Sequence, residues 1–204
     1  MKKKYLFNWL SVLLFSFLLV GCSAEEKTTV EKQEEVVEEV KEYTVTDDVG
    51  NEITFEEVPE TIVSLQPSNT EILFALGVGD KIVGATDYDT YPAEALEIER
   101  VSDSVAFNAE RITELNPDVV IAYTIGQEEA LQLLEDTGLK VFVIESATSF
   151  EDVYGDIEQL ATVMGIEEKG QEVISSIQDT IQGVQERVET ASALKKVYYE
   201  IKIF

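Results

Sequence analysis

The side chains that could do chemistry in this chain are hydroxyls, phenols, amides and carboxylates, because it has no histidine and one cysteine. Histidine is the commonest general base, so its absence removes every Ser-His or Cys-His nucleophile pair. Asp87 and Asp89 could form an acid/base pair, but neighbouring acids in so acidic a chain are usually solvated. We therefore predict no catalytic residue, and a protein that binds its ligand without transforming it.

The charge of the chain excludes one class of partner. Its 41 acidic and 15 basic residues give a formal net charge of −26. Such a surface repels the phosphate backbone, so we predict no binding to nucleic acid. Met164 has the spacing of a core residue, so the chain also offers no imidazole, thiolate or thioether to hold a metal directly.

The first residues have the pattern of a secretory signal. Met1 is followed by three lysines, an apolar run from Leu10 to Val20, and then Gly21 and Cys22. The sequence LVGC at 19–22 resembles the lipobox of bacterial lipoproteins, which implies a signal peptide over 1–21 and lipidation of Cys22. We expect an extracytoplasmic protein anchored to the cell membrane, with the acidic residues 22–42 as a solvated tether.

The folded part alternates apolar strands with helices. Apolar and polar residues alternate on both sides of Asp48-Val49-Gly50-Asn51, which is the pattern of a β-hairpin. The later strands are apolar throughout, which is typical of a parallel sheet covered on both faces, so we predict an α/β, Rossmann-like lobe over 43–165. The expected strands are 61–65, 81–85, 118–123 and 140–144, and the expected helices begin near residues 68, 109, 127 and 150.

A long amphipathic helix follows this lobe. Val173, Ile177, Ile181, Val184 and Val188 recur at helical steps, which predicts a helix of roughly 24 residues, about 36 Å long, within 166–194. Residues 195–204 then begin another strand, KKVYYEI. A single strand with no following partner suggests an interrupted protein.

Three segments resemble one family of receptors. These are IVSLQPSNTEILFALGVGDKIVGATDYDTYP at 62–92, NAERITELNPDVVIAY at 108–123 and GLKVFVIE at 138–145. They are similar to the metal-chelate class of solute-binding proteins of bacterial ABC importers, which take up ferric siderophores, haem and cobalamin. The resemblance implies two α/β lobes joined by one long helix, with the ligand between them. We expect this chain to supply the N-terminal lobe, the helix and the first strand of a C-terminal lobe that is missing, and therefore to bind ligand weakly.

The expected ligand contacts follow the strands, because open α/β sheets bind ligands at the carboxyl ends of their strands. The resemblance adds that the ring of Tyr88 packs on the ligand. We expect a ferric siderophore or a corrinoid, with haem less favoured, and no cofactor of the protein itself. The candidate contacts are Gln66, Pro67, Ser68, Tyr88, Asp89, Phe107, Tyr123, Thr124 and Ser146.

Glu71 has two interpretations. Ser68 and Glu71 have the spacing of a helix capping box, which alone would explain the glutamate. The resemblance implies instead that this glutamate projects from the lobe and pairs with arginine on the membrane permease of the ABC transporter.

Two other classes of function stay open. The apolar face from Val173 to Val188 could pair with another chain, as an interaction module or in a dimer. A hydrolase or transferase on a doubly wound scaffold would require a lysine or a carboxylate as its base.

Overall fold

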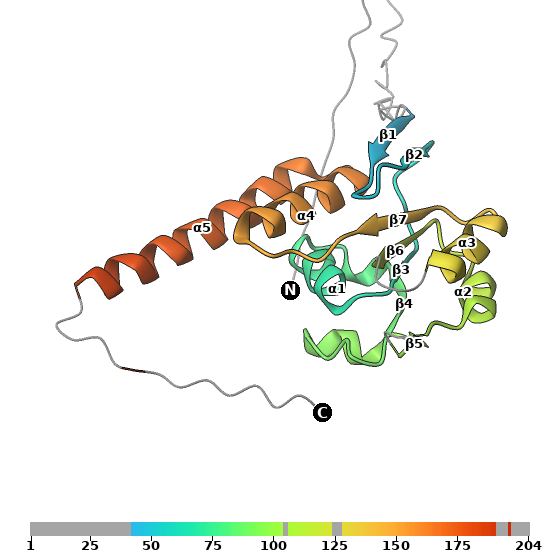
Figure 1. Cartoon of the computed structure of the whole chain (residues 1–204), viewed down its shortest axis with the longest axis horizontal. Helices are drawn as coiled ribbons and strands as arrows, with labels where there is room; N and C mark the ends of the chain where they lie inside the picture. Colours follow the sequence, from blue (N-terminus) through green and yellow to red (C-terminus); the bar gives the residue numbers. More distant parts are fainter. Residues whose placement is uncertain (1–41, 104–105, 124–127, 191–195, 197–204) are drawn as a thin grey trace, which may run out of the picture. The chain divides into compact units, whose positions relative to one another are not determined.

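Five short apolar strands form a parallel sheet (Figure 1) in the order β5-β4-β3-β6-β7. Helices cover both faces, so β3 and β7 are buried at every residue. The four predicted strands are confirmed, whereas β5 was missed because its three residues include an arginine and give no apolar run. The strands are β3 (Ile62–Ser64), β4 (Ile82–Thr86), β5 (Arg100–Ser102), β6 (Val119–Tyr123) and β7 (Val141–Ile144).

The two faces of the sheet carry separate hydrophobic cores. Side chains alternate along a strand, so Ile121 belongs to one core and its neighbour Val120 to the other. The first core packs against α1 (Pro67–Ala75), α4 (Phe150–Val163) and α5 (Glu167–Glu189). The second packs against α2 (Ala109–Leu115) and α3 (Glu128–Asp136). Two short 3₁₀ helices, η1 (Gly79–Lys81) and η2 (Ala93–Glu97), lie in the connections on either side of β4.

The predicted hairpin is formed by β1 (Tyr43–Thr46) and β2 (Glu52–Phe55). Buried Asp47 closes its turn by accepting a hydrogen bond of 2.7 Å from the backbone N–H of Asn51. The next residue ties the hairpin to the sheet, since the N–H of Asp48 donates to the carbonyl of Val143 (3.1 Å). The Tyr43 hydroxyl donates to the carbonyl of Val163 at the end of α4 (2.6 Å). The hairpin therefore closes one end of the first core.

Helix ends agree with the sequence in all but one case. Asn108 caps α2, and a capping box of Ser149 and Asp152 begins α4. The capping box predicted for Ser68 and Glu71 is wrong. Gln66 is the N-cap of α1 and Pro67 its first residue, so Ser68 already lies inside the helix and makes no capping bond. Proline favours this first position because it has no N–H to leave unsatisfied.

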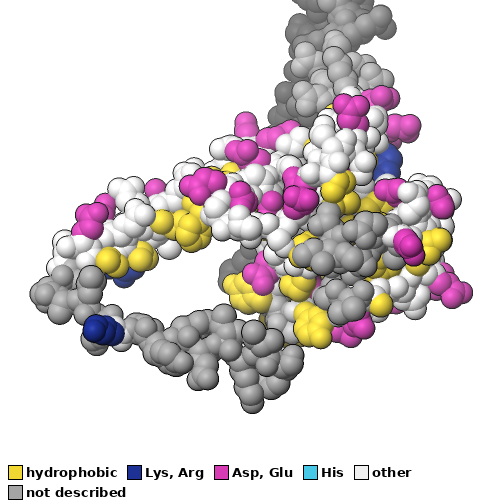
Figure 2. Space-filling view, viewed as in Figure 1, with side chains coloured by type: hydrophobic (Ala, Val, Ile, Leu, Met, Phe, Trp, Pro, Cys, Tyr) yellow, Lys and Arg dark blue, Asp and Glu magenta, His cyan; other side chains and the backbone are white. Residues whose placement is uncertain are grey.

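The predicted long helix is α5, 23 residues that begin against α4. Gly170 allows the close approach, because a Cβ there would lie 2.7 Å from the Cβ of Ala161. The far half of α5 extends beyond the sheet (Figure 1), and its apolar face is visible along one side in Figure 2. Val184 and Val188 on this half are 44% and 54% exposed. None of the described helices is both long and apolar enough to cross a membrane.

The computed structural model describes residues 42–103, 106–123, 128–190 and 196. All of them belong to one compact unit that spans 39–204. Several predictions fall outside the described residues: the signal peptide, the lipidation of Cys22, the tether apart from Glu42, and the strand within 195–204 apart from Lys196.

Candidate functional site

The carboxyl ends of β3, β6 and β7 meet at one edge of the sheet. The chain passes from β3 outward to β4 and β5, and then returns to place β6 on the other side of β3. The helices that follow β3 and β6 consequently pack on opposite faces, α1 in the first core and α3 in the second. Open α/β sheets bind ligands at such a switch point, because the diverging connections leave a crevice there.

A cavity of about 410 Å³ opens at this edge, and we call it the strand-end pocket. Its volume is within the range of small-molecule sites. Most polar residues come from the strand ends and from the start of α1, with Asp156 added from α4, whereas most apolar side chains come from α1, α4 and α5. The polar lining includes Gln66, Ser68, Asn69, Glu71, Tyr123, Glu145, Ser146 and Asp156, and the apolar lining includes Ile72, Val153, Ile157, Val173 and Ile177.

Four of the nine expected ligand contacts are brought together in this pocket: Gln66, Ser68, Tyr123 and Ser146. The hydroxyl of Ser146 donates to the phenol oxygen of Tyr123 over 2.9 Å, which links the ends of β6 and β7. The carbonyl of Gln66 accepts the N–H of Thr70 (3.1 Å) and so begins α1 beside them. Parallel pairing of β3, β6 and β7 therefore assembles this part of the site.

The other candidates lie elsewhere. Tyr88 is 64% exposed in the turn after β4 and does not line the pocket. Phe107 packs against the second core, and Pro67 begins α1 without lining the pocket. Thr124 lies outside the described residues. The described structure thus separates Tyr88 and Phe107 from the strand-end pocket.

Asp89 has a structural part in the loop after β4. Its side chain is 1% exposed and accepts hydrogen bonds from the N–H (2.9 Å) and the hydroxyl of Thr86. Arg100 completes the loop by donating to the carbonyls of Thr86 (2.8 Å) and Asp89 (3.0 Å). A carboxylate as buried as this offers almost no surface to a ligand.

Among the pocket residues that sequence reasoning missed, Asn69 and Asp156 are the buried polar ones. Asn69 is 1% exposed, and its Nδ2 has no partner among the described residues. Asp156 is 8% exposed on α4. Burial, and then the nearby charges of Asp48 and Asp152, raise the pKa of Asp156 to about 6. The sequence could have indicated Asp156, because it lies three positions after Val153 and therefore on the helix face that is otherwise apolar.

Glu71 is exposed on α1 and also lines the pocket. Since Ser68 does not cap the helix, the structural explanation for this glutamate is lost. The interpretation as a docking residue is left, and it stays a prediction. Pairing of the apolar face from Val173 to Val188 with another chain stays a prediction as well.

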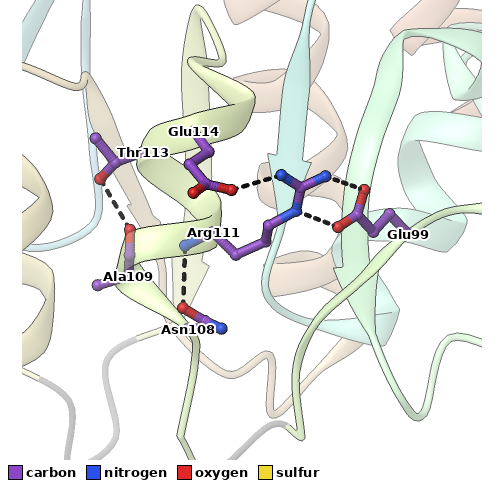
Figure 3. Close-up of polar contacts among 6 residues, drawn as sticks. All are labelled: Glu99, Asn108, Ala109, Arg111, Thr113 and Glu114. Atoms are coloured by element: carbon purple, nitrogen blue, oxygen red, sulfur yellow. Dashed lines mark hydrogen bonds and ion pairs between the residues drawn. The ribbon is translucent and has the colours of Figure 1, made fainter.

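On the opposite face of the sheet, Arg111 fixes α2 to the start of β5 (Figure 3). Its guanidinium makes two hydrogen bonds to Glu99, one of them 2.8 Å long, and one of 2.6 Å to Glu114. Hydrogen bonding to Arg111 holds the pKa of Glu99 below its ordinary value, and the two carboxylates raise the pKa of Arg111. Arg111 therefore holds α2 to the start of β5, and it does not line the strand-end pocket.

The doubly wound lobe, its strand-end pocket and its long final helix define a ligand-binding protein. Among the described residues, no three His, Cys, Asp or Glu side chains are placed to hold a metal ion. The model of the periplasmic binding protein family matches residues 62–201. The chain belongs to this family, and the homologues it matches are named as binding proteins and not as enzymes.

Two curated relatives match much of this chain. The chain is 36% identical over 200 residues to the ABC transporter substrate-binding lipoprotein YvrC of Bacillus subtilis, covering 95% of this chain and 62% of that protein. It is 32% identical over 140 residues to the vitamin B12-binding protein of Vibrio parahaemolyticus, covering 68% and 50%. The chain thus spans about half to three fifths of the length of these relatives.

Solved structures show the same fold. The vitamin B12-binding protein BtuF of Vibrio cholerae matches with a TM-score of 0.58 and 31% identity, over 65% of this chain and 52% of that one. The heme-binding protein HmuT matches with a TM-score of 0.64 and 28% identity, over 72% and 48%. The predicted family and fold class are therefore confirmed.

Proposed function

We propose that this chain is a substrate-binding lipoprotein of an ABC importer for a chelated metal or a corrinoid. The observation that carries the proposal is the convergence of Gln66, Tyr123 and Ser146 at the switch point of the sheet. Relatives named as a substrate-binding lipoprotein and as vitamin B12-binding proteins support it. The ligand is bound as a finished chelate, through aromatic and polar contacts.

Ligand binding is expected to be weak for the chain as given. On this proposal the described residues supply one wall of a site that a second lobe would complete, and affinity depends on how completely the ligand is enclosed. We expect a dissociation constant above about 1 μM, measured by isothermal titration calorimetry on the full chain carrying Cys22→Ser. The probes are cyanocobalamin, a ferric trihydroxamate, a ferric catecholate and haem.

Tyr123→Ala tests whether the strand-end pocket is the site. We expect it to weaken binding of the best probe about tenfold, since a Tyr ring combines apolar area with a polar group. Tyr91→Ala is the matched control, because Tyr91 is 68% exposed and does not line the pocket. If none of the probes binds, or if the two substitutions have the same effect, the proposed function is contradicted.

Glu71 is the proposed point of docking to the permease. A charge reversal, Glu71→Arg, should lower the stimulation of transporter ATPase activity by at least fivefold, because opposed charges mainly set the orientation of an encounter. Glu110→Arg on α2 provides the control, since it lies on the opposite face of the sheet. Equal stimulation by both variants would remove Glu71 from the interface.

The proposed anchor is lipid on Cys22. Cells that express the full chain should hold it in the membrane fraction and incorporate labelled fatty acid into it, whereas Cys22→Ser should do neither. Lipid-free protein in the membrane fraction would contradict the anchor without affecting the ligand proposal.

A further inference from the structure

Asp156 occupies an unusual position between two hollows of the surface. It lines the strand-end pocket and also a neighbouring cavity beneath the connection from β7 to α4, which is lined by Asp48 and Asp152 among others. The side chain is 8% exposed, and none of the described residues donates a hydrogen bond to it. A charged side chain with so little exposed surface normally has a hydrogen-bond partner, whereas the carboxylate of Asp156 meets only the space of the two cavities.

The surroundings supply only like charge. Glu71 of α1 and Glu145 of the connection after β7 line the same pocket, and Val173 and Ile177 of α5 carry no charge. Tyr123 from β6 is the remaining titratable group in the pocket. None of the described residues that line either cavity is a lysine or an arginine. The carboxylates of the two linings, which we call the acidic wall, are Asp48, Glu71, Glu145, Glu151, Asp152 and Asp156.

Six of the seven lysines and arginines in the described residues are committed elsewhere, and the seventh, Lys196, is exposed and lines neither cavity. Lys81 pairs with Glu60 and Lys169 with Glu172, while Lys140 lies over the ring of Phe55. Arg100 and Arg187 donate to backbone carbonyls, and Arg111 is held by two glutamates. Of these residues, none is left to neutralise Asp156.

Two buried polar atoms point to a ligand independently of the charge. Nδ2 of Asn69, in the strand-end pocket, and Oε1 of Gln159, in the neighbouring cavity, have no partner among the described residues. An unmade hydrogen bond of a buried group costs on the order of 1–3 kcal/mol, so such atoms favour a bound group that satisfies them. Asn69 requires an acceptor, and Gln159 requires a donor.

We propose that Asp156 anchors a positively charged group of the ligand, and that the strand-end pocket selects cationic organic ligands or chelates over anionic ones. Asn69 accompanies the anchor by donating to an oxygen of the same ligand. A chelate that carries an ammonium group and carbonyl-type oxygens fits both, whereas a ligand with exposed carboxylates or catecholates is repelled by the acidic wall. This inference rests on the proposed function of the pocket and narrows its class of ligand.

Binding of a cation should also depend on pH. Because the pKa of the free Asp156 is raised to about 6, its carboxyl is mostly protonated at pH 5 and ionised at pH 7.5. A cationic ligand favours the ionised form, so its affinity should rise about tenfold between these pH values. A neutral ligand of the same shape should show no such increase.

The first test uses three small probes of one shape: benzylammonium, benzyl alcohol and benzoate. NMR titration of the full chain carrying Cys22→Ser should show binding at the pocket in the order cation, alcohol, anion, with at least a tenfold preference for the cation at pH 7.5. Asp156→Asn should remove most of that preference and its pH dependence. Asp136→Asn on the exposed side of α3 is the matched control and should retain both.

Equal affinity for the three probes, a preference that survives Asp156→Asn, or no binding of any probe would overturn the inference. A second experiment distinguishes failure of this inference from failure of the proposed function. A ferric trihydroxamate with one free ammonium group is compared with the same chelate acetylated on that amine. Tighter binding of the free amine supports Asp156 as the anchor, whereas equal binding of both supports the proposed function and contradicts the inference.

Discussion

Individual carboxylates in this lobe have opposite effects on stability, and the presence or absence of hydrogen-bond donors decides the sign. Asp156 is buried without a partner, so its raised pKa means that the native state holds a proton that the unfolded state releases. Both states are protonated below about pH 4, and the stability then falls as pH rises to about 6. Above about pH 6 the loss of stability caused by ionised Asp156 no longer changes with pH.

We therefore predict that Asp156→Asn stabilises the protein at pH 7.5 and has little effect at pH 4. The rise of about two pKa units sets an upper limit of about 3 kcal/mol, and solvent screening of this partly hydrated carboxylate lowers the expected gain to about 1–2 kcal/mol. Urea unfolding at the two pH values measures it. A variant that is destabilised at pH 7.5 would show that Asp156 has a partner in the native state.

Asp118 has the reverse effect. Burial alone would raise its pKa, but the N–H groups of Glu60 and Thr61 (2.9 and 2.8 Å) and the Thr61 hydroxyl lower the pKa below its ordinary value. This stabilisation is complete above about pH 4 and is lost as pH falls through the lowered pKa. Asp118→Ala should cost roughly 1–2 kcal/mol at pH 7, and less at pH 2.5, in the same unfolding assay. An equal cost at both pH values would mean that charge has no part in it.

At the scale of elements, short polar motifs fix where each helix begins. Ser149 caps α4 by accepting the N–H of Asp152 (3.1 Å), and Asp152 accepts from Thr148 and Ser149 in return. These bonds place the start of α4, which carries Asp156, next to the end of β7.

Loss of this cap should weaken the whole lobe. Ser149→Ala is expected to lower the free energy of unfolding by about 1 kcal/mol, because a donor of the first turn loses its acceptor. Ser175→Ala in the middle of α5, on an exposed site, is the control and should change stability by less than about 0.5 kcal/mol. Thermal unfolding followed by circular dichroism compares the two.

The strands, the hairpin and the long helix could be predicted from the sequence, because apolar runs and helical spacing report burial directly. β5 could not, because it is short and includes Arg100. Ser68 was misassigned because local spacing did not reveal that Pro67 already begins the helix. Asp156 was missed because its environment comes from Asp48 and from the sheet, which are distant in the sequence.

At the scale of the molecule, the joint between α4 and α5 depends on one glycine. Gly170→Ala would force a Cβ to within 2.7 Å of Ala161, and we expect it to cost about 1–3 kcal/mol. Gly183→Ala, in the same helix, meets nothing within 4 Å and should stabilise it by about 0.5–1 kcal/mol. Urea unfolding of both variants measures the difference. If both stabilise equally, the two helices are not in close contact at Gly170.

The contact between α4 and α5 at Gly170 also sets the direction of the rest of α5. About 19 residues of α5 extend past it, a stiff arm of roughly 28 Å. A tilt of about 5° at the crossing would swing the tip by roughly 2–3 Å, so a small local displacement is multiplied along the arm. An alanine side chain at position 170 would therefore change the direction of the far half of α5.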